Sequence, residues 1–385
     1  MGNFELLRLL AQGGMADIYL ARHLGGQLER YVAVKVLNRQ RANDPEACAL
    51  FLDEARLLAM LNHHSLATVF EVDVESGVHY LAMEYVHGVD LRELLAAAQG
   101  AEAAIPYEVA LGVVAAAAAG LDHAHRRCDA EGRPMHLVHR DVSLSNIMIG
   151  HDGAVKVVDF GIATATVSTH STNPGIVRGK ASYMSPEQCV GDPVDLRTDV
   201  FALGVVLYEL TTGRRCFVGN SDFERMLAVV RGEYVRPTQA VEGYPLELEQ
   251  VVCTALALDP AERYSSAAQL IEALERVMAG RGWTGGARAI TRFMHELFGE
   301  VLEPWAGTPT ARHDTDVLAV ADEDVLDAVQ LPQPDPTIVI TKPRRLARGT
   351  EAEPVASEWQ EDEPTRGRRS AVRLRARTAG DALAA

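Results

Sequence analysis

Two segments of the chain carry short oxygen-bearing side chains at a regular spacing. The run VHRD ends at Asp141 and is followed by Asn146, and the run VVDFG contains Asp159. Carboxylate and amide oxygens on short side chains are the ligands that a hard cation such as Mg²⁺ prefers. A further carboxylate can orient a hydroxyl group for attack. These residues therefore indicate chemistry in which a cation neutralises charge while a carboxylate directs a nucleophile.

A lysine and a glutamate from the first part of the chain form a second candidate pair. Lys35 lies in the strand-like run YVAVKVL, and Glu54 lies in the helical stretch after it. Glu54 can reach back as the ion-pair partner of Lys35 and hold its ammonium group in a cleft. Taken alone, the pair is also compatible with an exposed salt bridge.

A run of small residues comes before these two groups. It consists of Ala11, Gln12, Gly13, Gly14, Met15 and Ala16. A loop that closes over phosphates must bring backbone N–H groups near the oxygens, which only small residues allow. By itself the run is equally compatible with an ordinary hairpin turn.

The elements that must position these residues fall into two groups. Residues 4–38 alternate between polar and apolar and predict a hairpin and a third strand, and residues 67–72 and 78–85 predict two more. From Pro45 a helical stripe is formed by Phe51, Leu52, Ala55, Leu58 and Leu61. The pattern from Asp90 to Met278 is mostly helical, with strands and loops at 137–186. This predicts an α+β fold, in which a small β lobe with one main helix meets a larger helical lobe at a cleft.

The composition and periodicity also predict where these parts begin and end. The β lobe covers about residues 1–86 and the helical lobe about 87–278, joined by residues 84–88. Residues 279–302 form a helical extension, because 290–302 keep helical periodicity. Residues 303–385 are rich in Pro, Asp, Glu and Arg with few aromatic residues, which predicts a disordered tail. Its acidic and basic runs favour a solvated linker over a docking segment.

Composition excludes several classes of partner. The net charge of −16 opposes binding to nucleic acid or to an anionic membrane. The longest apolar run, Val109 to Ala119, is about half the ~20 residues that a membrane span needs, so we expect a buried helix. The start MGNFELL lacks the features of a signal peptide. The cysteines form no CxxC pair and His123 and His125 lack zinc-type partners. We therefore expect a cytoplasmic protein without a histidine metal site.

In order and position, the segments resemble the bacterial, eukaryotic-like serine/threonine kinases over roughly residues 3 to 278. The resemblance implies a two-lobed protein kinase fold and transfer of the γ-phosphoryl of Mg-ATP to serine or threonine hydroxyls of proteins in bacterial signalling. Lys35 would hold the α- and β-phosphates with Glu54 as its partner. Asp141 would orient the hydroxyl, and Asn146 and Asp159 would bind Mg²⁺.

The resemblance also implies residues for the rest of the nucleotide and for the framework. The small-residue run would cover the phosphates. Adenine would lie between Ile18 and Ala33 on one side and Met148 on the other, beside Met83 and the backbone from Glu84 to Val86. Glu187 would pair with Arg263, and Asp199, placed before an apolar helix at 200–210, would cap and hold the catalytic-loop backbone.

Several positions depart from the family pattern. Ala11 and Ala16 replace two glycines, and Ser143 stands where most serine/threonine kinases have lysine. Lys180 stands where the family has threonine. We hypothesise that Lys180 supplies the missing charge at the catalytic loop while the Ser143 hydroxyl contacts Asp141. In the alternative, Lys180 faces solvent or an acidic substrate.

Other functions remain open at this point. The departures favour a pseudokinase that binds nucleotide or partners without catalysis as the main alternative. A small-molecule phosphotransferase is disfavoured by the SPE run and Arg263, and tyrosine specificity by the absence of an A-A-R insert. The protein substrate cannot be identified. A transient dimer would serve autophosphorylation, for which Thr169, Ser171 and Thr172 are candidate sites near Arg140.

Overall fold

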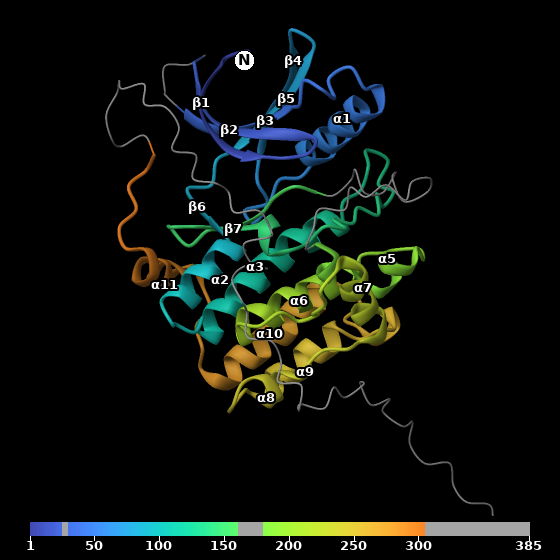
Figure 1. Cartoon of the computed structure of the whole chain (residues 1–385), viewed down its shortest axis with the longest axis vertical. Helices are drawn as coiled ribbons and strands as arrows, with labels where there is room; N and C mark the ends of the chain where they lie inside the picture. Colours follow the sequence, from blue (N-terminus) through green and yellow to red (C-terminus); the bar gives the residue numbers. More distant parts are fainter. Residues whose placement is uncertain (25–29, 161–179, 305–385) are drawn as a thin grey trace, which may run out of the picture. The chain divides into compact units, whose positions relative to one another are not determined.

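The N-terminal lobe is an antiparallel sheet with one long helix against it. The computed structural model describes residues 1–24, 30–160 and 180–304, all within one compact unit. The strands run in the order β1-β2-β3-β5-β4. Figure 1 shows this lobe above the helices of the second lobe. Its elements are β1 (Phe4–Gln12), β2 (Ala16–His23), β3 (Arg30–Leu37), α1 (Pro45–Ala59), β4 (Val69–Glu75) and β5 (Val78–Glu84).

The two faces of this sheet are buried in different clusters. Val34 belongs to a small cluster with Phe4 and Tyr80. Ala33, its neighbour on β3, belongs to the main core together with Met83 of β5. Because side chains alternate along a strand, Lys35 shares the face of Ala33.

Helix α1 lies against that second face, and its ends are set by local chemistry. Asp44 caps the N-terminus by accepting hydrogen bonds from the backbone of Glu46 and Ala47. Phe51 and Ala55 are buried in the main core. Glu54 is buried beside them at 5% exposure, so the only carboxylate on the buried stripe faces the sheet.

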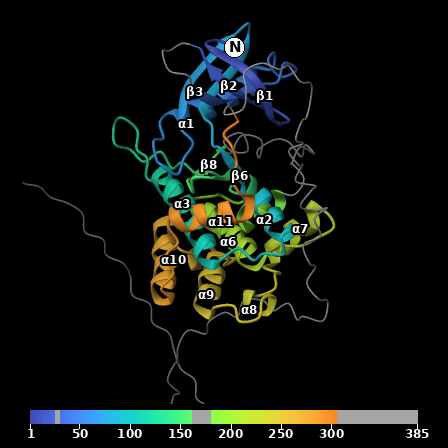
Figure 2. The same ribbon diagram turned by 90° about the vertical axis from the view of Figure 1, so that its left-hand side faces the viewer.

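The C-terminal lobe is organised around α6, whose side chains are almost all buried. Helices α3, α9 and α10 pack on it, and a small sheet of order β6-β7-β8 lies on the side facing the N-terminal lobe (Figure 2). The elements are β6 (Gly88–Asp90), α2 (Leu91–Gly100), α3 (Tyr107–His125), η1 (Leu144–Asn146), β7 (Ile147–Gly150), β8 (Val155–Val157), η2 (Lys180–Tyr183), α5 (Pro186–Val190), α6 (Arg197–Thr212), α7 (Asp222–Arg231), α8 (Pro237–Ala240), α9 (Leu246–Ala255), η3 (Pro260–Glu262), α10 (Ala267–Arg281) and α11 (Ala287–Phe298).

Two close approaches explain glycines in α3. A Cβ atom on Gly112 would lie 1.8 Å from the carbonyl oxygen of Gly285, in the segment leading to α11. A Cβ on Gly120 would lie 2.9 Å from Leu66 Cδ2, in the loop that joins α1 to β4. The glycines therefore let both the C-terminal segment and the N-terminal lobe come close to α3.

The α+β architecture and the order of elements predicted from sequence are confirmed. The hydrophobic run at 109–119 lies inside α3, and among the described residues no helix is long and apolar enough to cross a membrane. Strand β4 begins two residues later than expected, and β6 was not anticipated. Asp199 lies in the first turn of α6, because this helix begins at Arg197 and not after Asp199 as expected. The candidate sites Thr169, Ser171 and Thr172 and residues from 305 onward lie outside the described residues.

Candidate active site

Lys35 forms the centre of a buried charge cluster between the lobes. Its Nζ lies 2.8 Å from Glu54 Oε1 and 3.0 Å from Asp159 Oδ1. Burial would lower the pKa of Lys35, but the carboxylates of Asp159 and Glu54 outweigh it and the pKa is raised. The ammonium of Lys35 holds the pKa of Asp159 below its usual value, whereas burial raises the pKa of Glu54. The cluster therefore holds a permanently charged ammonium at the junction of β3, α1 and the residues after β8.

The lobes are joined beside this cluster by two further contacts. The backbone N–H of Ala67 donates to the carbonyl of Val157, at 3.1 Å. Lys156 Nζ lies 2.8 Å from Glu84 Oε1, at the end of β5. Since β8 leads directly into Asp159, these contacts fix where its carboxylate meets Lys35.

Three polar side chains meet in the loop before β7. Asn146 Nδ2 donates to Asp141 Oδ2 at 2.9 Å and to the Asp141 carbonyl at 2.7 Å. Lys180 Nζ, from η2, donates to the same Oδ2 at 2.5 Å. The carboxylate of Asp141 is thus held from its own loop and from a segment 39 residues later.

Asn146 and Asp159 form the candidate metal site. The backbone N–H of Val158, next to Asp159, donates to the Asn146 carbonyl at 3.0 Å, which keeps the two residues adjacent. With its amide nitrogen engaged by Asp141, Asn146 presents Oδ1 as its remaining acceptor, and Ser145 Oγ approaches it at 3.3 Å. Two hard oxygen donors of this kind fit a Mg²⁺ ion.

The backbone around Asp141 is held by the carboxylate of Asp199. Asp199 accepts from the N–H of His139 at 2.8 Å and from the N–H of Arg140 at 2.9 Å. Burial would raise the pKa of Asp199, but its hydrogen bond from His125 outweighs this and the pKa is lowered. Asp199 therefore holds the catalytic-loop backbone, as predicted.

His139 connects this loop to Val158, the residue before Asp159. Its Nε2 lies 3.1 Å from the Val158 carbonyl, and its Nδ1 accepts from the N–H of Asp141 at 3.3 Å. Burial lowers the pKa of His139, which favours the neutral ring that this pattern of one donor and one acceptor requires. Its ring packs 4.5 Å from that of Phe160. His139 therefore holds the catalytic loop against the residues around Asp159 by hydrogen bonds and by packing.

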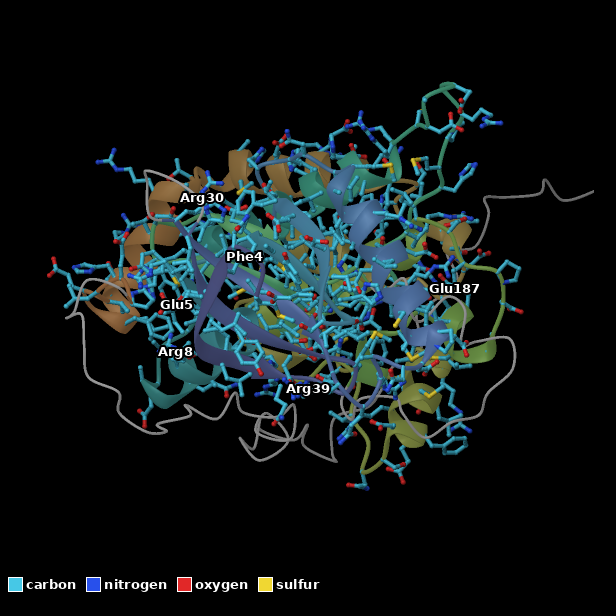
Figure 3. All side chains as sticks on the ribbon, turned by 90° about the horizontal axis from the view of Figure 1, so that it is seen from above. Phe4, Glu5, Arg8, Arg30, Arg39 and Glu187 are labelled. Carbon is cyan, nitrogen blue, oxygen red and sulfur yellow. The ribbon has the colours of Figure 1, made fainter. Side chains whose placement is uncertain are left out.

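The segment before α6 is anchored by a buried ion pair. Arg263 donates to both carboxylate oxygens of Glu187 at 2.7 Å, and Thr198 Oγ1 donates to one of them at 2.8 Å. Burial would raise the pKa of Glu187, but the bonds from Arg263 lower it overall. Figure 3, looking down on the N-terminal lobe, shows Glu187 on the side away from Arg8 of β1.

The predicted nucleotide residues lie on the expected elements. Ala11 and Gln12 end β1, Gly13, Gly14 and Met15 form the turn, Ala16 and Ile18 lie on β2, Ala33 on β3, Met83 and Glu84 on β5, Val86 in the linker and Met148 on β7. Ile18 pairs with Lys35, and Ala33 with Met83. Asn38 ties down the turn, because its side chain donates to the Gly13 carbonyl at 2.8 Å. That contact could not be read from the sequence.

A family model described as "Protein kinase domain" matches residues 4–274. The chain belongs to the protein kinase family. Members of this family use ATP and a divalent metal, in keeping with the oxygen donors of Asn146 and Asp159.

Individual kinases are similar over most of this chain. The tyrosine-protein kinase MasK of Myxococcus xanthus is 39% identical over 300 residues, which is 78% of this chain and 46% of MasK. The serine/threonine-protein kinase PknB of Mycobacterium leprae is 40% identical over 283 residues, 72% of this chain and 43% of PknB. A crystal structure of a mutant of the PknI kinase domain from Mycobacterium tuberculosis has a TM-score of 0.54 at 28% identity, covering 71% of this chain and 95% of that one. The chain spans less than half the length of the curated relatives MasK and PknB.

Within this kinase framework, the departures at positions 143 and 180 have distinct environments. Lys180 contacts the carboxylate of Asp141, as required by the hypothesis that it supplies the missing charge at the catalytic loop. Ser143 is buried, and its Oγ lies 2.9 Å from Ser145 Oγ. The contact with Asp141 that we expected from the Ser143 hydroxyl is thus made by Lys180.

Sequence reasoning missed several residues that hold the kinase site together. His125 and Thr198 bind the carboxylates of Asp199 and Glu187, and Gln188 donates to the Arg140 carbonyl at 2.9 Å. Only the SPEQ run, in which Gln188 stands three residues after a capping serine, gave any signal of these contacts.

Proposed function

We propose that this protein is a serine/threonine protein kinase that transfers the γ-phosphoryl of Mg-ATP to protein hydroxyls, itself included, in bacterial signalling. The observation that carries the proposal is the convergence of Lys35, Asp141 and Asp159 from three distant segments, each with its charge partner in place. Phosphoryl transfer requires positioned phosphates, neutralised charge and an oriented hydroxyl, and these three residues supply one each.

In this proposal each side chain acts on a different part of the reactants. Lys35, aimed by Glu54, binds the α- and β-phosphates, and Asn146 and Asp159 hold Mg²⁺, which supplies neutralisation of phosphate charge. Asp141 accepts the hydroxyl proton of the substrate. Lys180 lies beside Asp141 and provides a positive charge where the transferring phosphoryl gains negative charge.

The same proposal includes where the adenosine of ATP binds and where the kinase domain begins and ends. The turn from Ala11 to Ala16 covers the phosphates. Adenine lies against Ile18, Ala33, Met83 and Met148, with hydrogen bonds to the backbone from Glu84 to Val86. Residues 1–278 form the kinase domain with its lobes meeting near residue 86, and the protein acts in the cytoplasm.

A phosphosite-mapping experiment tests the proposed function. The purified protein is incubated with Mg-ATP beside an Asp141→Asn control, and phosphorylated residues are mapped by mass spectrometry. We expect phosphoserine or phosphothreonine in the wild type only, with sites among Thr169, Ser171 and Thr172. Equal phosphate incorporation in both proteins, or none in either while nucleotide still binds, would favour the pseudokinase alternative. Replacing Mg²⁺ by Ca²⁺ should abolish incorporation if the hard-cation site requires octahedral geometry.

Tyrosine transfer is a second candidate because MasK is named a tyrosine-protein kinase. Against it stand PknB and a probable serine/threonine-protein kinase of Clostridium perfringens, 34% identical over 278 residues. Phosphoamino-acid analysis of the same reaction decides between them. Phosphotyrosine as the main product would replace our assignment.

A further inference from the structure

The peptide bond before Asp141 is held in an unusual conformation. Arg140 has φ = +67°, a left-handed backbone that residues with a Cβ atom rarely adopt. Such a residue keeps its conformation only where surrounding groups fix it. Asp199 binds the N–H of Arg140 at 2.9 Å, and His139 Nδ1 accepts from the N–H of Asp141 at 3.3 Å. The carbonyl of Arg140 is the other polar group of the same planar peptide, so its partner fixes the second edge of that peptide.

Gln188 binds that carbonyl from outside the catalytic loop. Its Nε2 donates to the Arg140 oxygen at 2.9 Å, across 48 residues of sequence. Its Oε1 accepts from the backbone N–H of Ser185 at 2.9 Å, which completes the capping of α5. One side-chain amide thus joins the start of α5 to the residue before Asp141.

The position of Gln188 is itself fixed. The preceding residue, Glu187, is bound by Arg263 and Thr198, so α5 is anchored on the C-terminal lobe. An amide is also the chemical group that these two contacts require, because one partner is a donor and the other an acceptor. A glutamate could accept from Ser185 but could not donate to Arg140.

We propose that Gln188 is a positioning residue that sets the orientation of Asp141 through the Arg140 carbonyl. The inference rests on the proposed kinase function. It predicts that Gln188 affects phosphoryl transfer and leaves nucleotide binding unchanged, because Lys35 and Asp159 do not depend on this peptide. Gln188 also links η2, which carries Lys180, to the loop that carries Asp141, since Ser185 follows η2 by two residues.

The test exploits a second capping glutamine that lacks the catalytic contact. In α10, Ser266 is the N-cap and accepts from the N–H of Gln269 at 3.3 Å, while Gln269 Oε1 accepts from the N–H of Ser265 at 2.9 Å. Gln188→Glu and Gln269→Glu each keep a side-chain acceptor for a backbone N–H at the start of a helix, that of the N-cap residue in α5 and that of the residue before the N-cap in α10. Only the first removes a donor to the catalytic loop. Gln188→Met and Gln269→Met form a second pair that removes the amide without adding charge.

We measure kcat, KM for ATP, the dissociation constant of Mg-ADP and thermal melting in the full chain. Gln188→Glu and Gln188→Met should lower kcat by on the order of 10-fold, because a small displacement of a catalytic group is costly. KM for ATP and Mg-ADP affinity should change by less than about 2-fold, since the lost interaction concerns the transferring group. Both Gln269 variants should keep the kcat of the wild type.

Two further results decide between a positioning role and a structural one. If the effect passes through Asp141, Gln188→Glu should change the residual rate of Asp141→Asn by less than about 2-fold. Unchanged kcat in a folded Gln188 variant would show that the amide does not act on catalysis, and loss of folding in both variants would assign it a purely structural role. Either result would overturn the inference. A wild type that transfers no phosphate, or transfers as much as Asp141→Asn, would instead overturn the proposed function and this inference with it.

Discussion

Lys180 and Asp141 lie in contact although the family resemblance leads one to expect threonine at position 180. A threonine hydroxyl could bind Asp141 but carries no charge. The ammonium of Lys180 binds Asp141 and also carries a positive charge. Its side chain is 24% exposed, so the group can still reach a phosphoryl placed beside Asp141. The exchange of residue types at 143 and 180 is thus compatible with transfer.

Lys180→Ala should therefore reduce turnover strongly. We expect kcat to fall by on the order of 10²-fold or more, the scale for removing one group that stabilises charge in a transition state. ATP affinity should change much less, because the interaction is strongest at the transferring group. Steady-state kinetics on a generic protein substrate, with Mg-ADP binding as the control, measures both. Near-normal turnover would show that Lys180 faces the solvent or substrate without acting on the phosphoryl.

The paired exchange Ser143→Lys with Lys180→Thr gives a stricter test. If a positive charge near Asp141 is required, the double variant should regain activity that neither single variant retains. Ser143 is 1% exposed, so the single change Ser143→Lys should also lower the melting temperature. Activity of the double variant no better than that of the singles would mean that position 143 cannot deliver the charge.

At this scale the sequence predicted the residues whose spacing is characteristic and missed those defined only by tertiary contact. The contact of Lys35 with Glu54 was predicted correctly, because Lys35 stands in a recognisable run and Glu54 lies on the helix that follows it. The contact of Lys35 with Asp159 was not predicted. His125 and Gln188 meet their partners across 74 and 48 residues, and no local pattern encodes such a contact. We expected the Ser143 hydroxyl to contact Asp141, but Lys180 makes that contact. The long side chain of lysine is compatible with a contact to Asp141 and with a position beside it, and the sequence does not distinguish the two.

Among the elements, α11 is the least expected contributor, since it lies beyond the matched residues 4–274. It packs along α3 (Figure 2). Ile290, Phe293 and Met294 are buried, and Thr291 Oγ1 donates to the Asp152 carbonyl in the β7–β8 turn. Phe298 also packs edge-on to His151 in that turn. The helix therefore supports the hairpin that precedes Asp159.

Truncation at two positions should separate the contribution of α11 from that of the C-terminal tail. A chain ending at Gly286 should melt at least about 5 °C below the full chain, because several buried apolar side chains are lost at about 1.5–3 kcal/mol each. A chain ending at Gly307 should keep its melting temperature and its basal ATP hydrolysis, since the removed segment has little apolar area. Thermal melting of the two shortened chains measures the difference. A loss of several degrees in the longer one would show that the tail packs on the lobes.

A point variant tests α11 without truncation. Phe293→Ala should destabilise the protein by about 3–5 kcal/mol, as for other buried aromatic residues, and urea unfolding measures the loss. Phe223 is 74% exposed on α7, so Phe223→Ala serves as the matched control and should change little. Equal effects in the two variants would show that α11 contributes no packing energy.

Periodicity predicted most elements because their apolar spacing differs clearly between strand and helix. It missed β6, a strand of three residues that exists because Gly88 approaches β7 closely; a Cβ there would lie 1.9 Å from the Ile149 carbonyl. It also gave residues 290–302 a helical pattern without indicating where that helix packs. Partners in space, unlike local conformation, depend on the assembled core.

For the whole molecule, the junction of the lobes carries both the charge cluster of Lys35 and a group of histidines. His63, in the loop after α1, stacks on His123 of α3 with ring centroids 5.2 Å apart and lies 4.1 Å from the ring of His64. Its Nδ1 accepts from the N–H of Ser65 at 3.1 Å. A proton on His63 would therefore place a positive charge against two other imidazole rings at the contact between the lobes.

Acidification should therefore weaken the fold through His63. Burial, and then the neighbouring His64 and His123, lower the pKa of His63 in the folded state. The unfolded chain binds a proton below about pH 6.5, while the folded chain resists it, so the contribution of His63 is present above that pH and is lost as the pH falls. His63→Asn keeps an acceptor for Ser65 and removes the titration. The free energy of unfolding of the wild type, relative to this variant, should fall between about pH 7.5 and 5.5 and stay constant between about pH 8 and 9. Urea unfolding across this range measures the difference, and a difference independent of pH would show that the junction does not sense protonation of His63.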